Sequence, residues 1–230
     1  MFSIFQRKPE SRDRVMTDGT LIFSADAFLT HMISGSLKEL GVPFTFKSEK
    51  LNDCIRIFDE SQIDIAFIDV RNDAIKPGKL LRALANIPGY RLNKLILYFI
   101  GEPGDLVLPQ ELRASARYIS APISSSQMIR RLGGDLLPHH SKKLKKLYSK
   151  DRRAVERGSF EYFKQILDQL VLDVGNFSRQ SSHREKVLMD GSVHVQQCLH
   201  ACGAPELAEK VGSTPRDARS MKKLVNNLQT

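Results

Sequence analysis

The sequence has few cysteines and no long apolar stretch, and both features exclude whole classes of protein. Three cysteines in 230 residues, Cys54, Cys198 and Cys202, are too few and odd in number for a disulfide framework. There is no run of about 18 apolar residues to predict a membrane span, and the apolar part of MFSIFQRK is too short for a secretory signal. We therefore expect a cytoplasmic protein with no membrane partner.

Signatures of catalysis are also missing. The chain shows no recognisable pair of nucleophile and base. It also has no glycine-rich phosphate loop, since GEPG at 101–104 is interpreted as an isolated turn. No CxxC pair occurs, and His194, Cys198 and Cys202, spaced four apart, cannot surround a tetrahedral metal ion from one straight helix. We expect a protein that is not an enzyme, with no small-molecule substrate and no required cofactor. The two C-terminal cysteines are interpreted as small core residues.

Positive charge is concentrated in the C-terminal part of the chain. The whole protein carries a net charge of +9. After residue 138 there are 17 Lys and Arg and 10 Asp and Glu, a net charge of +7, so residues 1–138 carry only +2. A basic region beside a nearly neutral one indicates an anionic partner such as nucleic acid or an acidic protein. A basic surface that is merely solvated is the alternative.

Short apolar strands alternate with helices between residues 19 and 137. The central stretch, IDIAFIDVRND at 63–73, is too densely apolar for a half-exposed strand and predicts a buried parallel strand that ends at Asp69. Such alternation is typical of an α/β fold with a five-stranded, doubly wound parallel sheet. The other predicted strands are 21–24, 44–47, 94–100 and 117–120; the predicted helices are 27–40, 50–60, 77–86 and 124–136, with an ambiguous helical stretch at 109–115.

These five units resemble the receiver domain of bacterial response regulators, which has a flavodoxin-like fold. Asp69 stands at the phosphoacceptor position, and Asp26, 43 residues earlier, stands at the second acidic position. Ala121 and Pro122 occupy the family's Lys-Pro positions 52 residues after Asp69, and Tyr118 lies where many receivers have a switching aromatic residue. Since clustered carboxylates suit Mg²⁺, the resemblance implies a weak Mg²⁺ site at Asp26 and Asp69.

The reactive groups of the family are depleted in this sequence. Ala25 stands at the first acidic position, Ile100 at the hydroxyl position and Ala121 at the lysine position. Without the lysine and the hydroxyl, the usual route from phosphate to conformational change is missing. We predict a pseudo-receiver that dimerises or binds a protein partner through its fourth helix, fifth strand and fifth helix. Two alternatives remain: a receiver weakly phosphorylated at Asp69, and an unrelated flavodoxin-like domain in which Asp69 is a plain loop residue.

The rest of the chain is predicted to be helical. Apolar residues at spacings of three and four predict an amphipathic helix that begins at Phe160, with Ser159 as its N-cap. The stretch 184–229 is also predicted to be helical, with breaks at glycines 191, 203 and 212. The predicted organisation is a flexible basic arm at 1–18, a receiver-like domain at 19–137, a basic linker at 138–157 and an all-α domain at 158–230.

Residues 206–228 resemble a helix-turn-helix. Ala208, Gly212, Ala218 and Met221 occupy the small packing position, the turn glycine and two later core positions of that family. Gly212 would take the left-handed conformation that ends the first helix. The resemblance implies a dimeric transcription regulator whose second helix binds DNA in the major groove. The DNA-facing side chains would be Arg216, Arg219, Ser220, Lys223 and Asn227.

Two alternatives remain open for the C-terminal region. It is an ordinary helical pair with a solvated basic face, or it resembles a histidine phosphotransfer bundle, whose H-x-x-K-G motif precedes a Gly-Ala step. Here Gly203-Ala204 follows His194 by nine residues, and Gln197 and Cys198 stand where Lys and Gly would be. That resemblance implies His194 as the candidate phosphodonor. The protein would then be a non-DNA-binding adaptor or phosphotransfer-like protein of a two-component phosphorelay.

Overall fold

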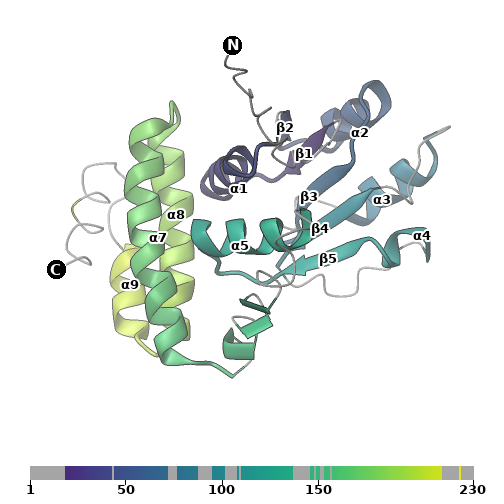
Figure 1. Ribbon diagram of the computed structural model, residues 1–230. Coiled ribbons are helices and arrows are strands. Elements are labelled where there is room, and N and C mark those ends of the chain that lie inside the picture. The colour runs from purple at the N-terminus through teal and green to yellow at the C-terminus, as the bar shows by residue number, and fades with distance from the viewer. Residues whose placement is uncertain are drawn as a thin grey trace, which may run out of the picture.

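In the computed structural model, five strands form one parallel sheet in the order β2-β1-β3-β4-β5 (Figure 1). The structure describes residues 19–42, 44–71, 77–87, 95–101, 108, 110–136, 146–147, 149–150, 153–155, 157–213 and 223. The strands are β1 (Thr20–Phe23), β2 (Thr45–Ser48), β3 (Ile65–Asp69), β4 (Ile96–Ile100) and β5 (Ala116–Ile119). This is the flavodoxin-like order, and the predicted α/β fold is confirmed.

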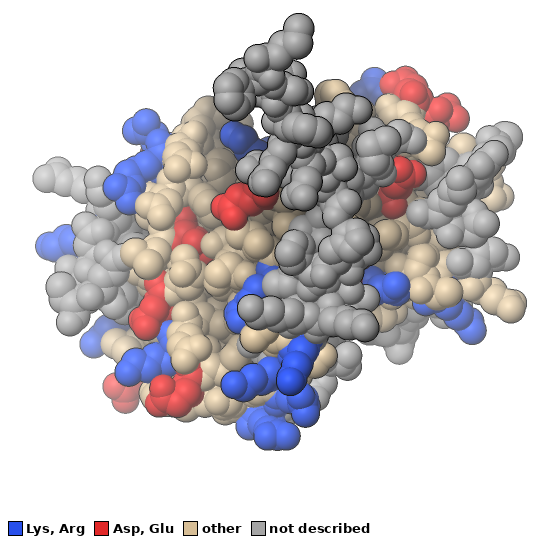
Figure 2. Space-filling view, viewed as in Figure 1, with Lys and Arg blue, Asp and Glu red and all other residues tan. Residues whose placement is uncertain are grey.

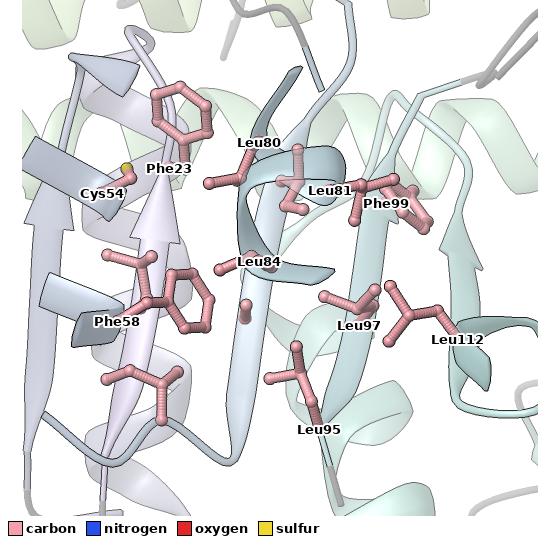
Figure 3. Packing of buried hydrophobic residues seen from close by; sticks show 14 of the residues in the cluster. Phe23, Cys54, Phe58, Leu80, Leu81, Leu84, Leu95, Leu97, Phe99 and Leu112 are labelled. Atoms are coloured by element: carbon pink, nitrogen blue, oxygen red, sulfur yellow. The ribbon is translucent and has the colours of Figure 1, made fainter. Parts of the chain in front are cut away.

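Helices cover both faces of the sheet, which explains why β3 is buried along its whole length. Alternate strand residues face opposite sides: Leu21 and Phe23 of β1 join one core, and Ile22 joins the other. Figure 3 shows the first core, in which Cys54 and Phe58 pack on the strands together with three leucines that follow in the sequence, Leu80, Leu81 and Leu84. That face carries α2 (Leu51–Glu60), α3 (Pro77–Ala85) and α4 (Gln110–Arg113); the other carries α1 (Ala27–Glu39) and α5 (Ser125–Leu136).

The helical region packs directly against the α/β domain. It consists of α7 (Phe160–Gln180), α8 (Arg184–Ala201) and α9 (Pro205–Ser213), and Ser159 stands at the N-cap of α7 as predicted. Helices α7 and α8 form a hairpin that stands beside α1 and α5 (Figure 1). Phe28 of α1 is fully buried in the core of this hairpin. The two parts of the chain therefore share one hydrophobic interface.

The helix break predicted at Gly191 is wrong, because α8 runs through this residue without interruption. A Cβ atom at Gly191 would lie 2.5 Å from Cγ2 of Val174 on α7 and 3.1 Å from Cδ2 of Phe28 on α1. The missing side chain of Gly191 therefore allows α8 to pack closely against α1 and α7. Gly203 does separate two helices, and its φ of 75° is the left-handed conformation that glycine accepts readily.

The cysteines belong to the packing of the molecule. All three are free, and Cys54 and Cys198 are buried in the two cores that contain them. Burial raises the pKa of Cys54 to about 11, and it raises the pKa of Cys198 as well, so both remain neutral thiols at pH 7. The part of the chain that the structure describes contains no helix both long and apolar enough to cross a membrane.

Candidate functional site

The carboxyl ends of β1 and β3 bring the two predicted acidic residues to one place. Phe23 pairs with Ile68 in the sheet, so Ser24 follows next to Asp69, and its Oγ donates a hydrogen bond of 2.8 Å to Asp69 Oδ2. Asp26 is the N-cap of α1, where its Oδ1 accepts from the backbone N–H of Leu29 at 2.8 Å. The aspartates are therefore held by a strand end and a helix start at the edge where α/β sheets place their sites.

Arg71, which the sequence analysis missed, joins the two carboxylates. Its Nε donates to Asp69 Oδ1 at 2.9 Å and its Nη2 to Asp69 Oδ2 at 2.9 Å, which is a bidentate pair. The same Nη2 donates to Asp26 Oδ2 at 2.9 Å. A cation two residues after the strand-end aspartate is the only signal of this role in the sequence, and the loop geometry that turns the side chain back is not readable from it.

Gly101 makes room for the Arg71 side chain. This glycine follows Ile100 at the end of β4, next to the strand position that pairs with Asp69. Its φ is 102°, and a Cβ atom there would lie 2.5 Å from Cγ of Arg71. Where the receiver resemblance expects a hydroxyl, this chain has the buried apolar Ile100 followed by space for an arginine. The end of β4 therefore supplies no hydroxyl and instead leaves space for the Arg71 side chain.

His194 brings α8 into the same cluster. Its Nε2 lies 2.7 Å from Asp26 Oδ2 and 3.2 Å from Arg71 Nη1, and its ring, fully buried, packs 5.0 Å from the ring of Phe28. We assign the donated proton to Nε2, because the ionised carboxylate has none to give. Among the described residues, none forms a hydrogen bond with Nδ1. In this arrangement the imidazole of His194, which was predicted as a phosphodonor, is a hydrogen-bond partner of Asp26.

Two further carboxylates attach the hairpin to the same edge. Asp190 of α8 accepts a hydrogen bond of 2.6 Å from the backbone N–H of Ala27, at the start of α1. Asp173 of α7 accepts from the backbone N–H of Ser125 at 3.0 Å and from its Oγ at 2.9 Å, at the start of α5. Free N–H groups and the helix dipole favour negative charge at these two positions. Each hairpin helix therefore caps a helix of the α/β domain.

The environment of Asp26 and Arg71 keeps both groups charged. Burial alone raises the pKa of Asp26, but the hydrogen bond and charge of His194, the charge of Arg71 and the Leu29 N–H outweigh it and hold the pKa well below its usual range. Burial alone lowers the pKa of Arg71, and the two aspartates outweigh that effect and raise it. Asp26 and Arg71 consequently form an ion pair at physiological pH.

The carboxylates that cap the two helix starts behave differently from Asp26. The pKa values of Asp173 and Asp190 are both raised, chiefly by burial, while the hydrogen bonds from Ser125 and Ala27 act in the opposite direction. No arginine or lysine ion pair to either carboxylate is found in the described part of the chain. These caps therefore stabilise the interface through hydrogen bonds to the backbone, at some cost in desolvation.

The Mg²⁺ ion implied by the receiver resemblance does not fit this arrangement. Magnesium needs near-octahedral oxygen ligands and retains several waters. Here Asp26 Oδ2 already accepts from Arg71 and His194, and both oxygens of Asp69 accept from Arg71 or Ser24. Asp69 is also only 2% exposed, so its carboxylate has no open path to a phosphoryl donor. Metal binding would require the guanidinium to leave.

The predicted DNA-reading face lies almost wholly outside the described residues. Lys223 is described, as an exposed helical residue, whereas Arg216, Arg219, Ser220 and Asn227 are not. The left-handed conformation predicted for Gly212 is wrong, because this glycine is a helical residue of α9 and does not have a positive φ; the residues that follow Ser213 lie outside the described part of the chain. Ala208 and Val211 are buried in the hairpin core, and a Cβ at Gly212 would meet the side-chain amide of Gln196 on α8. Close packing against Gln196 therefore accounts for a glycine at this position.

The sequence matches no protein-family model, and a search of curated proteins finds no significant relative. The response-regulator family thus stays a prediction, supported by the strand order and by the meeting of Asp26 and Asp69.

Proposed function

We propose that this protein is a non-enzymatic signalling protein whose receiver-like sheet works without phosphorylation, as a docking platform for its own helical region. The observation that carries the proposal is the Arg71 guanidinium, which lies 2.9 Å from both Asp26 and Asp69. A phosphorylated receiver needs a metal ion to neutralise these carboxylates. In this chain a covalently attached cation does so, and the neutralised state needs no external ion.

The docked hairpin supplies a means of regulation. His194 and Asp190 attach α8 to the first residues of α1, and Phe28 is buried between them and α7. A protein partner that binds the carboxyl edge of the sheet has to displace α8, and displacement would uncover Asp26 and Phe28. Docking and release of the hairpin would then convey the signal that phosphate conveys in an active receiver. The start of α5, on the face predicted to bind partners, already contacts α7 through Gln127 and Tyr162.

The phosphorylation test is direct. Incubation of the full chain with acetyl phosphate and Mg²⁺ is expected to leave its intact mass unchanged, and titration calorimetry is expected to detect no Mg²⁺ binding. Arg71→Gln, which frees the two carboxylates, should gain measurable Mg²⁺ binding, whereas Arg82→Gln on the exposed part of α3 should not. A phosphate adduct on the unmodified chain that disappears in Asp69→Asn would overturn the proposal.

We further propose that the basic C-terminal part carries the output by binding DNA. Support comes from the net charge of +7 after residue 138 and from exposed cations that precede α7, namely Lys146, Lys150, Arg153 and Arg157. Figure 2 shows Lys and Arg side chains gathered at the lower edge of the molecule, where the chain leads into α7. Dimerisation through the receiver-like domain would place two such regions on neighbouring half-sites.

DNA binding is tested by its dependence on salt. Mixed-sequence DNA should bind at about 50 mM salt and be released steeply as salt rises, because binding displaces counterions from phosphates. Arg216→Ala and Arg219→Ala should each weaken binding, and Lys79→Ala on α3 is the charge-matched control. Absence of binding in low salt would remove the DNA proposal and favour the adaptor alternative, in which the helical region binds a signalling protein.

A further inference from the structure

A cavity of about 490 Å³ opens next to the acidic pair, on the β1–β2 side of the same sheet edge. Ser24, which follows β1, and Ser48, the last residue of β2, line it together with the exposed Lys47 and Lys50. The hairpin also lines the cavity, through Ser181 and His183 between α7 and α8 and through Val187 of α8. This volume is in the range usual for small-molecule pockets.

Among the described residues, no carboxylate pairs with the two lysines of this cavity. Of the two carboxylates that line it, Glu49 is paired with Lys186 of α8 at 2.7 Å, and Asp53 lies 3.6 Å from Arg56 in its own helix. Within the described part of the chain, neither Lys47 nor Lys50 has a carboxylate at ion-pair distance. The cavity therefore keeps a local excess of positive charge.

His31 and the start of α2 lie next to these lysines. The pKa of His31, which lines the cavity, is lowered by burial and also by the charge of Lys47, so the lysine acts on the interior of the pocket. Lys50, the N-cap residue of α2, makes no side-chain capping hydrogen bond, whereas α1 at the same edge is capped by the Asp26 side chain. The Lys50 side chain thus does not compete with an anion for the first N–H groups of α2, and the Asp53 carboxylate in the same turn lies 3.6 Å from Arg56.

We propose that this cavity binds a small molecule with a phosphate group, of about the size of a mononucleotide, and that Lys47 and Lys50 hold the phosphate. Phosphate suits these groups because its several oxygens accept from two ammonium groups and helix N–H donors together. The ligand would contact both the β1–β2 edge and His183 of the hairpin, so its binding favours the docked hairpin. The proposal does not require phosphorylation of Asp69: this residue does not line the cavity and adjoins it only through the hydrogen bond that Ser24 donates to it.

Binding is measured by titration calorimetry on the full chain with three probes at constant ionic strength: inorganic phosphate, AMP and adenosine. Phosphate and AMP should bind, AMP more tightly, and adenosine should not. Neutralising both lysines, in Lys47→Gln with Lys50→Gln, should weaken AMP binding about tenfold or more, because two charge-assisted contacts are lost. Lys38→Gln with Lys79→Gln, which removes two lysines that do not line the cavity, should leave the dissociation constant unchanged.

Hydrogen exchange tests where the ligand lies. AMP should slow amide exchange in the turn and first residues of α8, 181–187, which line the hairpin side of the cavity. The proposal is overturned if no probe binds, if adenosine binds as well as AMP, or if the double lysine variant retains full affinity. Exchange in 181–187 that AMP leaves unaltered would likewise contradict it. Circular dichroism of the variants separates these outcomes from misfolding, and the phosphorylation test on Asp69 is independent of all of them.

Discussion

The two sides of β1 at the carboxyl edge of the sheet differ in how their charges are compensated. On the β3 side, Asp26 and Asp69 are bound by Arg71 and His194; Asp69 and His194 are buried, and Asp26 and Arg71 are partly buried. On the β2 side, Lys47 faces a cavity without a carboxylate partner among the described residues. Arg71 and His194 therefore occupy the carboxylates at which a receiver performs its chemistry, whereas the lysines on the β2 side remain able to bind an anion.

Removal of Arg71 should show the difference most clearly. Arg71→Ala leaves the buried Asp69 and the partly buried Asp26 without their cation, and we expect the free energy of unfolding to fall by about 3–5 kcal/mol. Lys47→Ala removes a cation from the open side and should change it by less than about 0.5 kcal/mol. Denaturant unfolding of both variants measures the two effects. Equal losses would mean that the two sides do not differ in the way their charges support the fold.

The pH dependence of stability isolates the closed side. Because the folded pKa of Asp26 is held below its unfolded value, its contribution is present above the usual carboxyl range and is lost as pH falls toward the folded pKa. We expect this contribution to be on the order of 2–3 kcal/mol. Asp26→Asn should abolish it, so the difference between the two unfolding profiles should shrink as pH falls below about 4.

Asp173 and Asp190 change stability in the opposite sense. Their folded pKa values are raised, so protonation favours the folded state and each gains relative stability as pH falls through its folded pKa. The profile of the unmodified chain is therefore a sum of opposing slopes. A difference between the Asp26→Asn and unmodified profiles that does not vary with pH would contradict the assignment of Asp26 to the ion network.

Substitution of Gly191 tests whether helix packing holds the closed side together. The added methyl group of Gly191→Ala has no room between Val174 and Phe28, and we expect a loss of about 2 kcal/mol in the free energy of unfolding. Gly175→Ala on α7 is the matched control, since a Cβ there meets only the end of the Arg179 side chain, at 4.0 Å. The control should be stabilising by about 0.5–1 kcal/mol, the usual gain for alanine in a helix.

The smallest effect is expected at Asp190, which caps α1 from the hairpin. Asp190→Ala should cost about 1 kcal/mol and speed amide exchange at Ala27, because that N–H loses its acceptor. Asp190→Asn keeps an acceptor oxygen and avoids the burial of a charge, so it should retain most of the protection. If both variants leave exchange at Ala27 as it is, the hairpin does not hold the start of α1 in solution.

Much of the fold could be predicted from local pattern. Dense apolar runs mark strands covered on two faces, and apolar residues at spacings of three and four mark α7, so these elements were located to within a few residues. Strand order then makes neighbours of Asp26, which follows β1, and Asp69, which ends β3. The glycines of α8 and α9 were misread, because a glycine that ends a helix and one that admits a neighbouring helix look alike in sequence.

The sequence by itself determined the sheet, the placement of an aspartate pair at its carboxyl edge and the basic character of the C-terminal part. Only the tertiary structure decided what that pair does. Arg71 turns back from its loop into space left by Gly101, and His194 arrives from a helix 168 residues away from Asp26 in sequence. Local patterns encode which face of an element is apolar, whereas the partner of a buried charge is selected by packing between distant segments, where desolvation makes an unpaired carboxylate costly.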